Sequence, residues 1–356
     1  MSMIIDGSSH FDPVNYVREI AKSPNPRISD GANRMISIWN LHPNFVDCKA
    51  RISHLDETGI DVQLTMIQQD QDPNAFGLDD RELLRFSRLV NDECARFQNE
   101  SKGRIFALGS APLAKSKESM AEEMRRAVSD LGLRGFMVLS NVGGEPIDSF
   151  ASFWEEAERL DAVVYIHPAN SGTKQIRPYE FDFDLMHVFG WPYETTTMLS
   201  RLVFSGVMKN HPRLKVISHH MGGMVPFYWG RIGETYRQKP KQFAKSESGE
   251  MEGKRILDFG ARAADALAHA SLDRPVLDYF RMFYYDTAVG GSSAAIRCGY
   301  EVLGANRLVF GTDYPWGPEG GKKRLELYPK AVREACPSKE DQDKIFAHNM
   351  AKLLKI

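Results

Sequence analysis

The sequence predicts an α/β fold, a single (β/α)8 barrel (a TIM barrel) with lid-like insertions and C-terminal helices. Short apolar segments of strand length alternate with longer segments whose apolar residues recur at helical spacing. Polar residues follow several of these strands at their C-terminal ends, which is where such barrels carry their chemistry. The 356 residues suit one domain spanning 1–356, and no second domain's worth of sequence remains.

The composition is that of a soluble globular protein, with 42% hydrophobic and 26% charged residues. A formal net charge of -2 gives no broad electrostatic attraction to nucleic acid or to an anionic membrane. The four cysteines form no CxxC pair, which argues against a disulfide framework or a cysteine zinc site. Without a signal peptide or an apolar run of membrane length, the protein is expected to be cytoplasmic.

Apolar runs that end in polar or turn residues predict the strands. The first run is followed closely by His10, and the last by Gly-Thr-Asp-Tyr-Pro at 311–315, where proline ends the strand. Strands are predicted at residues 3–6, 61–67, 104–109, 135–139, 162–168, 214–218, 283–286 and 307–310.

Helices are predicted from apolar periodicity and from capping residues. Asp47 could cap a helix closed by Gly59, Asp79 and Asp80 open a long helix, and Gly132 ends another. Helices are expected at 47–58, from 79 onwards, and at 116–131, 148–160, 194–210, 224–237 and 293–303, with helical sequence also at 261–264. Insertions are expected at about 13–46, 169–190 and 238–280, the first of them irregular and forming a lid or the rim of the pocket.

Histidines and one aspartate stand at the predicted strand ends. His10 follows the first strand, His167 ends the fifth, His219 and His220 follow the sixth, and Asp313 follows the eighth. Each histidine alone is most simply a hydrogen-bonded structural residue, but in a parallel barrel these ends share one face. Imidazole and carboxylate with an open position make up a catalytic divalent-metal site. Neighbours on an extended segment point in opposite directions, so His219 and His220 are expected to diverge.

Arginine and aromatic residues could bind a substrate. Arg51 near the start of a helix and Arg231 after the sixth strand would hold a carboxylate through paired hydrogen bonds if they reach the pocket, although either could be a solvated helix residue. Phe11 and Trp191 could line that pocket or belong to the core.

Four motifs resemble a known family. Residues 217–227 with Gly230-Arg231-Ile232 resemble an H-x-G-G…P…G-R-I signature, and Pro192 to Thr196 resemble a P-x-E-T-T segment. Residues 164–168 and 310–315 match the corresponding fifth- and eighth-strand motifs. The family is the amidohydrolase-2 group of the amidohydrolase superfamily, which includes aminocarboxymuconate-semialdehyde and aromatic-acid decarboxylases.

The resemblance implies site residues and partners. His10, His167 and Asp313 match the metal ligands, Asp313 and His220 the catalytic residues, with His220 as the base. Arg51 and Arg231 match carboxylate-binding arginines, the latter reaching across the interface of a homodimer. The implied cofactor is one divalent metal, Zn²⁺ in the first place and Mn²⁺ in the second.

One position departs from the family. Ser8 stands where the family has the first histidine of H-x-H or the glutamate of E-x-H, and a neutral hydroxyl is a poor zinc ligand. The site could use His10, His167 and Asp313 with water, take a harder metal such as Mn²⁺, include Ser8, or have lost its metal. His219 is an additional histidine that could compensate.

The leading hypothesis is a metal-dependent, non-oxidative decarboxylase of an aromatic or unsaturated, muconate-like carboxylic acid. The same framework supports an alternative, a metal-dependent hydrolase or hydratase of a lactone, amide or unsaturated acid. A second alternative, motivated by Ser8, is a metal-free binding protein on a degenerate barrel. In the leading case the partner is a small carboxylic acid, with neither nucleic acid nor membrane involved.

Overall fold

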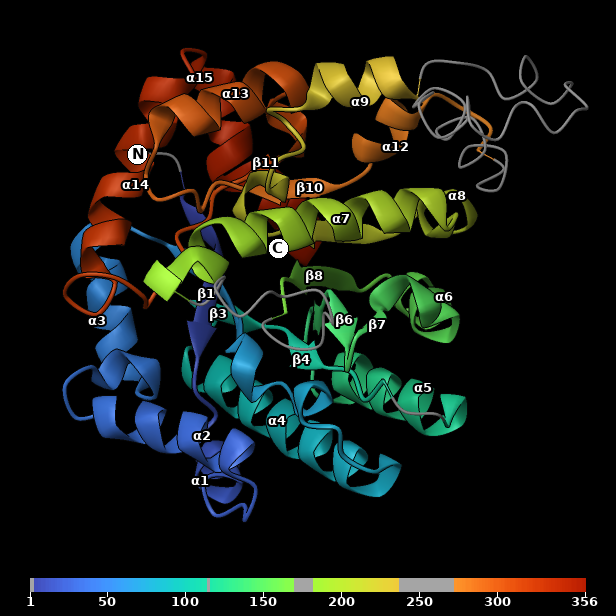
Figure 1. Cartoon of the computed structure of the whole chain (residues 1–356). Helices are drawn as coiled ribbons and strands as arrows, with labels where there is room; N and C mark the ends of the chain where they lie inside the picture. Colours follow the sequence, from blue (N-terminus) through green and yellow to red (C-terminus); the bar gives the residue numbers. More distant parts are fainter. Residues whose placement is uncertain (1–2, 114–115, 170–181, 237–271) are drawn as a thin grey trace, which may run out of the picture.

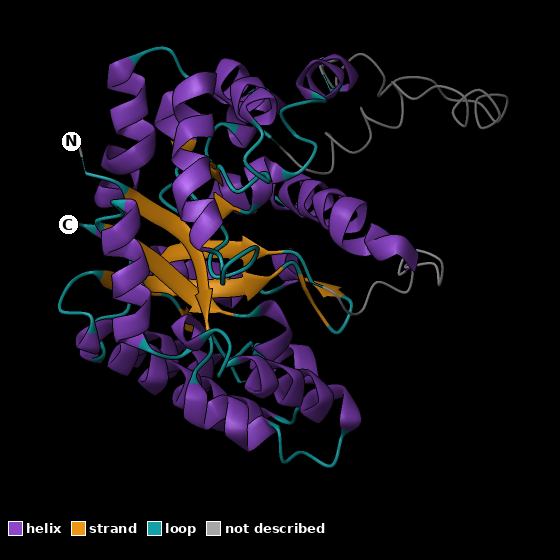
Figure 2. Ribbon diagram, turned by 90° about the vertical axis from the view of Figure 1, so that its left-hand side faces the viewer, coloured by secondary structure: helices purple, strands orange, loops and turns teal. Residues whose placement is uncertain are grey.

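The structure, a computed structural model, describes residues 3–113, 116–169, 182–236 and 272–356. It has an α/β fold in which strands run through the centre of the molecule and helices lie outside them (Figures 1 and 2). The central strands β5 and β8 are buried at every position. Apolar runs without alternation are typical of parallel strands that are covered on both faces.

The strands form parallel sheets. One sheet has the order β1-β2-β3 and the other the order β11-β10-β9-β8-β5-β4, while β6 and β7 form a separate antiparallel pair. Only Leu108 separates β3 from β4 along the chain. The strands are β1 (Ile5–Phe11), β2 (Val62–Ile67), β3 (Ile105–Ala107), β4 (Gly109–Ser110), β5 (Gly135–Leu139), β6 (Asn141–Val142), β7 (Glu145–Pro146), β8 (Val163–His167), β9 (Lys215–Ser218), β10 (Tyr284–Asp286) and β11 (Leu308–Val309).

Helices connect successive parallel strands. The principal ones are α1 (Val14–Ile20), α2 (Pro26–Ile38), α3 (Cys48–Thr58), α4 (Asp80–Glu100), α5 (Lys117–Arg125), α6 (Ala151–Arg159), α7 (Trp191–Phe204), α8 (Val207–Asn210), α9 (Trp229–Thr235), α12 (Val276–Phe280), α13 (Ser293–Leu303), α14 (Lys322–Ala335), α15 (Lys339–Asp343) and α16 (Asn349–Leu354). Short 3-10 or π-helical turns include η1 (Pro43–Phe45), η2 (Gln69–Gln71), η3 (Pro73–Phe76), η4 (Arg126–Asp130), η5 (Ile147–Ser149), η7 (Met186–Gly190), η8 (His220–Gly222), η10 (Ala305–Arg307) and η11 (Lys344–His348).

The predicted caps are confirmed. The Asp47 carboxylate accepts hydrogen bonds from the amides of Lys49 and Ala50, and Gly59 ends α3 with a φ of 73°. Asp79 caps α4 through the amide of Glu82. The expected helix at 116–131 is α5 continued by the π-helical turn η4.

Two local predictions differ from the structure. Residues 13–46 are not irregular, because they contain the helices α1 and α2. The first strand extends to Phe11, so that His10 lies within it rather than beyond it. The predicted helical sequence at 261–264 and most of the insertions at 169–190 and 238–280 lie outside the described residues.

β1 also contacts the chain that follows β11. The Gly7 amide donates to the Phe310 carbonyl (2.8 Å), and the Asp313 amide donates to the Ser8 carbonyl (2.8 Å). The pairing of β1 with β2 shifts register between Asp6 and Ser9. These bonds bring Asp313 and His10 to the same edge of the strands.

Among the helices in the described parts of the chain, none combines the length and the apolar character needed to cross a membrane.

Candidate active site

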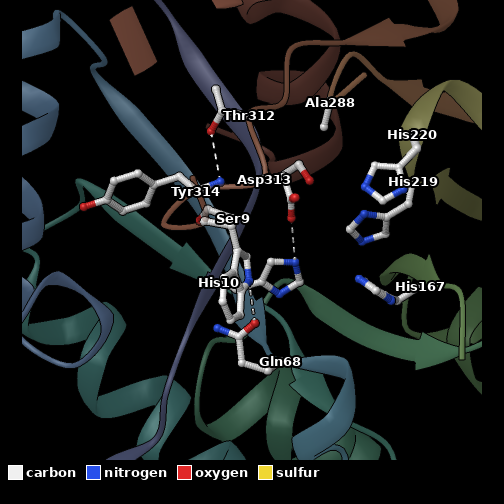
Figure 3. Close-up of polar contacts among 12 residues, drawn as sticks. Ser9, His10, Gln68, His167, His219, His220, Ala288, Thr312, Asp313 and Tyr314 are labelled. Carbon is white, nitrogen blue, oxygen red and sulfur yellow. Dashed lines mark hydrogen bonds and ion pairs between the residues drawn. The ribbon is translucent and has the colours of Figure 1, made fainter. Parts of the chain in front are cut away.

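The polar residues predicted at the strand ends converge in the structure. His10 lies in β1, His167 ends β8, His219 and His220 follow β9, and Asp313 follows β11. Because these strands are parallel, their C-terminal ends meet at one face. Figure 3 shows the five side chains facing a common centre, with Asp313 on the side of His10.

The distances in this cluster are short. The Nε2 atom of His10 lies 3.3 Å from Oδ1 of Asp313. The ring centroids of His167 lie 5.4 Å from His10 and 4.2 Å from His219. One ligand atom from each of His10, His167 and His219 lies within 4.8 Å of the others, so these three buried rings could hold a metal ion.

The hydrogen bonds of the rings define their tautomers. Nδ1 of His10 lies 3.0 Å from the Ile67 carbonyl, and Nδ1 of His167 lies 2.8 Å from the Pro168 carbonyl. A carbonyl oxygen only accepts, so each Nδ1 carries the proton and donates it. Nε2 is then the nitrogen that each ring can offer to a cation, and hydrogen bonds of this kind from Nδ1 orient metal-binding histidines.

The donor set fits a divalent cation. Because Nδ1 of His10 lies against the Ile67 carbonyl, Nε2 is directed toward the Asp313 carboxylate, 3.3 Å from Oδ1, and a cation bound between the two groups would be held by both. Burial lowers the pKa of His167 to about 3, which keeps its ring neutral. Burial alone would raise the pKa of Asp313, but a hydrogen bond and charge from His10 and a charge from His220, when these rings are protonated, lower it together with the charge of Arg324. Asp313 is therefore ionised at neutral pH.

The chain turns sharply after β9. His220 has a φ of 51° and Met221 a φ of 56°, both in the left-handed region that non-glycine residues rarely adopt. The His220 amide donates to Oδ1 of Asp286 at 2.8 Å, which holds this turn. The rings of His219 and His220 consequently lie 5.2 Å apart in the same cluster, and the expectation that they diverge is wrong.

Arg51 contacts the cluster through the backbone of His10. Its guanidinium is fully buried and donates to the Asn44 carbonyl (3.1 Å), to Gln63 Oε1 (3.1 Å), to Thr65 Oγ1 (3.1 Å) and to the His10 carbonyl. These internal acceptors occupy the donors that a substrate carboxylate would need. The arrangement does not fit the expected carboxylate-binding role and instead supports the backbone of β1 at His10.

Of the other residues predicted to contact a substrate, one borders the cluster, one lies in the core and one is exposed. Trp191, the first residue of α7, lies with its ring 5.6 Å from His167 and stacked at 6.4 Å on His220, so it borders the cluster. Phe11 is buried and stacks on Phe97 at 4.7 Å, which places it in the core and not in a pocket. Arg231 is exposed on α9.

Ser8 is buried, and its hydroxyl lies beside Tyr165 and Asp286 without a well-formed hydrogen bond to any described residue. It belongs to the side of the cluster that faces β10.

Three polar side chains of the site were missed from the sequence. Asp286 ends β10 and accepts from Tyr165 Oη at 2.5 Å, and the same strand-end rule that selected His167 could have found it. Nη1 of Arg324, in α14, donates to Oδ2 of Asp313 at 2.7 Å. No local signal marks Arg324 or Tyr165, because their contacts come from packing between distant segments.

A groove of about 420 Å³ lies elsewhere, between η3, α4, α5 and α6. None of the predicted site residues lines it, so the chemistry of the strand ends, rather than this groove, defines the candidate active site.

The fold and the cluster define the class of protein, a parallel α/β protein with a histidine and aspartate centre at the strand ends. The chain belongs to the amidohydrolase family, whose model matches residues 71–356. This confirms the resemblance drawn from the motifs.

Named relatives of the chain are decarboxylases. It is 29% identical over 280 residues to 2-amino-3-carboxymuconate-6-semialdehyde decarboxylase of Dictyostelium discoideum, an alignment that covers 78% of this chain and 68% of the relative. It is also 27% identical over 281 residues to gamma-resorcylate decarboxylase of a Rhizobium strain, covering 75% of this chain and 76% of the relative.

Solved structures share the fold. A 5-carboxyvanillate decarboxylase from Sphingomonas paucimobilis matches with a TM-score of 0.78 and 23% identity over all of both chains. A 5-carboxyvanillate decarboxylase from Novosphingobium aromaticivorans, in complex with manganese and 4-hydroxy-3-methoxy-5-nitrobenzoic acid, has a TM-score of 0.76 and 20% identity, covering all of this chain and 96% of that one. At these identities the likeness establishes the fold.

Proposed function

We propose that this protein is a metal-dependent, non-oxidative decarboxylase of an aromatic or unsaturated carboxylic acid. The observation that carries the proposal is the meeting of His10, His167 and Asp313 with His220 at one edge of the strands. The decarboxylase relatives support the reaction class, and the manganese in a solved neighbour supports a divalent metal.

The proposed roles follow from the chemistry of each group. His10, His167 and Asp313 would hold one divalent metal, Zn²⁺ or Mn²⁺, through two imidazole nitrogens and a carboxylate. The bound metal would polarise the substrate carboxylate or a neighbouring oxygen. His220 borders this centre with its ring 6.4 Å from His167, where it can supply a proton to a bound substrate.

The reaction balances with His220 as the proton source. Its imidazolium donates a proton to the carbon that bears the carboxylate. The carbon–carbon bond then breaks, its electron pair returns to the ring or the unsaturated chain, and CO2 leaves. The now neutral imidazole takes a proton from solvent before the next cycle.

We also infer that the two parallel sheets form one closed (β/α)8 barrel. The short interruption at Leu108 and the hydrogen bonds from Gly7 to Phe310 and from Asp313 to Ser8 support this closure. Such a closure would place the whole cluster at the mouth of the barrel.

A homodimer belongs to the same proposal. Arg231 is exposed on α9, and Phe227 nearby is 76% exposed, so both could meet a second subunit. Light scattering should then give twice the chain mass. A monomeric protein with full turnover would exclude a role for Arg231 across an interface.

The function is tested by turnover in D2O. The protein loaded with Mn²⁺ or Zn²⁺ is incubated with 2,6-dihydroxybenzoate, 5-carboxyvanillate and 2-amino-3-carboxymuconate semialdehyde, and CO2 release is measured. Decarboxylation places one deuteron on the carbon that lost the carboxylate, which proton NMR detects. His220→Asn should keep its metal and lose about 10²–10⁴-fold in rate.

Other outcomes separate the alternatives. Hydrolysis of a lactone or amide without CO2 would favour the hydrolase alternative. A protein that neither binds Zn²⁺ or Mn²⁺ nor turns over any acid would favour the metal-free binding protein.

A further inference from the structure

His219 is a buried histidine that forms no hydrogen bond with the described residues. The side chain is fully buried, and both ring nitrogens lack a partner among the described residues. Buried polar groups nearly always have a partner, and an exception needs a physical reason. None of the roles proposed for the decarboxylase uses this ring.

The ring is oriented as a metal ligand would be. Its Nδ1 lies 3.7 Å from Oδ2 of Asp286, so the Nε2 atom is directed away from that carboxylate. His10 and His167 show the same order, with Nδ1 on an oxygen and Nε2 left as the acceptor. The His219 ring lies 4.2 Å from His167 and stacks on His10 at 5.9 Å, and Figure 3 shows all three facing one centre.

The other neighbours of His219 do not supply a hydrogen-bond partner. The Tyr165 ring lies 4.4 Å away, but its hydroxyl donates to Asp286 instead. A buried imidazole with one nitrogen near a carboxylate, and with a ligand atom within 4.8 Å of those of His10 and His167, is suited to a cation.

Ser8 explains why a further ligand is needed. It stands two residues before His10, where the family pattern has histidine or glutamate, and its hydroxyl lies beside Tyr165 and Asp286. His219 directly follows the end of β9 with extended backbone, and its ring lies 4.2 Å from that of His167.

We propose that His219 is a metal ligand of this chain and replaces the ligand that Ser8 does not provide. The proposal rests on the metal-dependent function proposed above and deepens it. The resulting set of three imidazoles and one carboxylate suits Zn²⁺ and Co²⁺ better than Mn²⁺, which prefers oxygen ligands.

The test measures metal binding and not turnover. Zn²⁺ affinity is determined by equilibrium dialysis with a competing chelator, and Co²⁺ loading gives a visible absorption spectrum that reports the ligand set. The variants are His219→Ala, His167→Ala, Ser8→His and the double variant Ser8→His/His219→Ala. His220→Ala is the matched control, because it removes the neighbouring imidazole. Circular dichroism of each metal-free variant checks folding, and His219→Asn serves as a second variant if His219→Ala does not fold.

In the expected result, His219→Ala lowers Zn²⁺ affinity by at least about 100-fold and changes the Co²⁺ spectrum, while His220→Ala alters neither. The double variant recovers affinity, because histidine returns at position 8. If His219→Ala keeps the affinity and spectrum while His167→Ala loses them, His219 is not a ligand and the proposed metalloenzyme stands. If the unmodified protein binds neither Zn²⁺ nor Co²⁺, the metal-dependent function fails, and this proposal fails with it.

Discussion

Substitution of Arg51 distinguishes a structural role from substrate binding. The guanidinium donates to the carbonyls of Asn44 and His10, and to the side chains of Gln63 and Thr65. Arg51→Met removes these donors and leaves buried acceptors without partners. The Gln63 amide in turn donates to Asp6 at 2.8 Å, so the network reaches the first strand.

The magnitude follows from the contacts. A hydrogen bond that involves a charged group contributes about 1.5–3 kcal/mol, and the cost of burying the guanidinium offsets part of that. Removal of one member of a buried charged network typically costs about 3–5 kcal/mol. Arg51→Met should therefore lower the free energy of unfolding by about that amount. Arg51→Lys should be more stable than Arg51→Met and less stable than the unmodified protein. Lysine keeps the positive charge, but its ammonium lacks the planar arrangement of donors that lets the guanidinium reach these acceptors together.

The assay is urea unfolding of the metal-free protein, followed by tryptophan fluorescence, beside steady-state kinetics of the loaded protein. Arg213→Met is the control, because the Arg213 side chain is 76% exposed and should change stability by less than about 0.5 kcal/mol. A substrate anchor predicts a different pattern, a raised KM with unchanged unfolding. That pattern in Arg51→Met would refute the structural role of the buried guanidinium.

Two further perturbations test the buried framework. Burial raises the pKa of Asp72 to about 6, so its carboxyl contributes stability below its ordinary pKa and loses it as pH rises through about 6. Asparagine does not titrate, so the unfolding free energy of Asp72→Asn should rise relative to that of the unmodified protein by about 3 kcal/mol between about pH 3 and pH 7. Urea unfolding across this pH range measures the difference, and a difference that stays constant with pH would contradict the expectation. Gly135 has a φ of 148°, and a Cβ there would lie 1.9 Å from the Val163 carbonyl oxygen. Gly135→Ala should cost more than about 4 kcal/mol and yield insoluble protein, whereas Gly31→Ala in α2, with its nearest atoms 4.0 Å away, should gain about 0.5–1 kcal/mol in a thermal melt.

Much of the fold and part of the candidate site could be predicted from the sequence. Apolar runs and capping residues are local signals, so the strands around residues 62 and 135 and the cap at Asp47 appear where they were expected. The strand-end rule located His10, His167 and Asp313, because parallel strands bring their C-terminal ends together whatever their separation in the chain.

Tertiary structure alone decided the environments of these side chains. The sequence predicts a helix at Arg51 whether the side chain faces solvent, substrate or core. Only the packing of α3 against β1 and β2 shows that its guanidinium donates its hydrogen bonds to buried acceptors within the protein. The direction of the His220 ring depends on the left-handed backbone at His220, which is held by Asp286, 66 residues further along the chain. The apolar periodicity of a segment predicts that helix or strand alone. The direction of these side chains is set by contacts between two elements that are distant in the sequence, and no local pattern predicts which elements will meet.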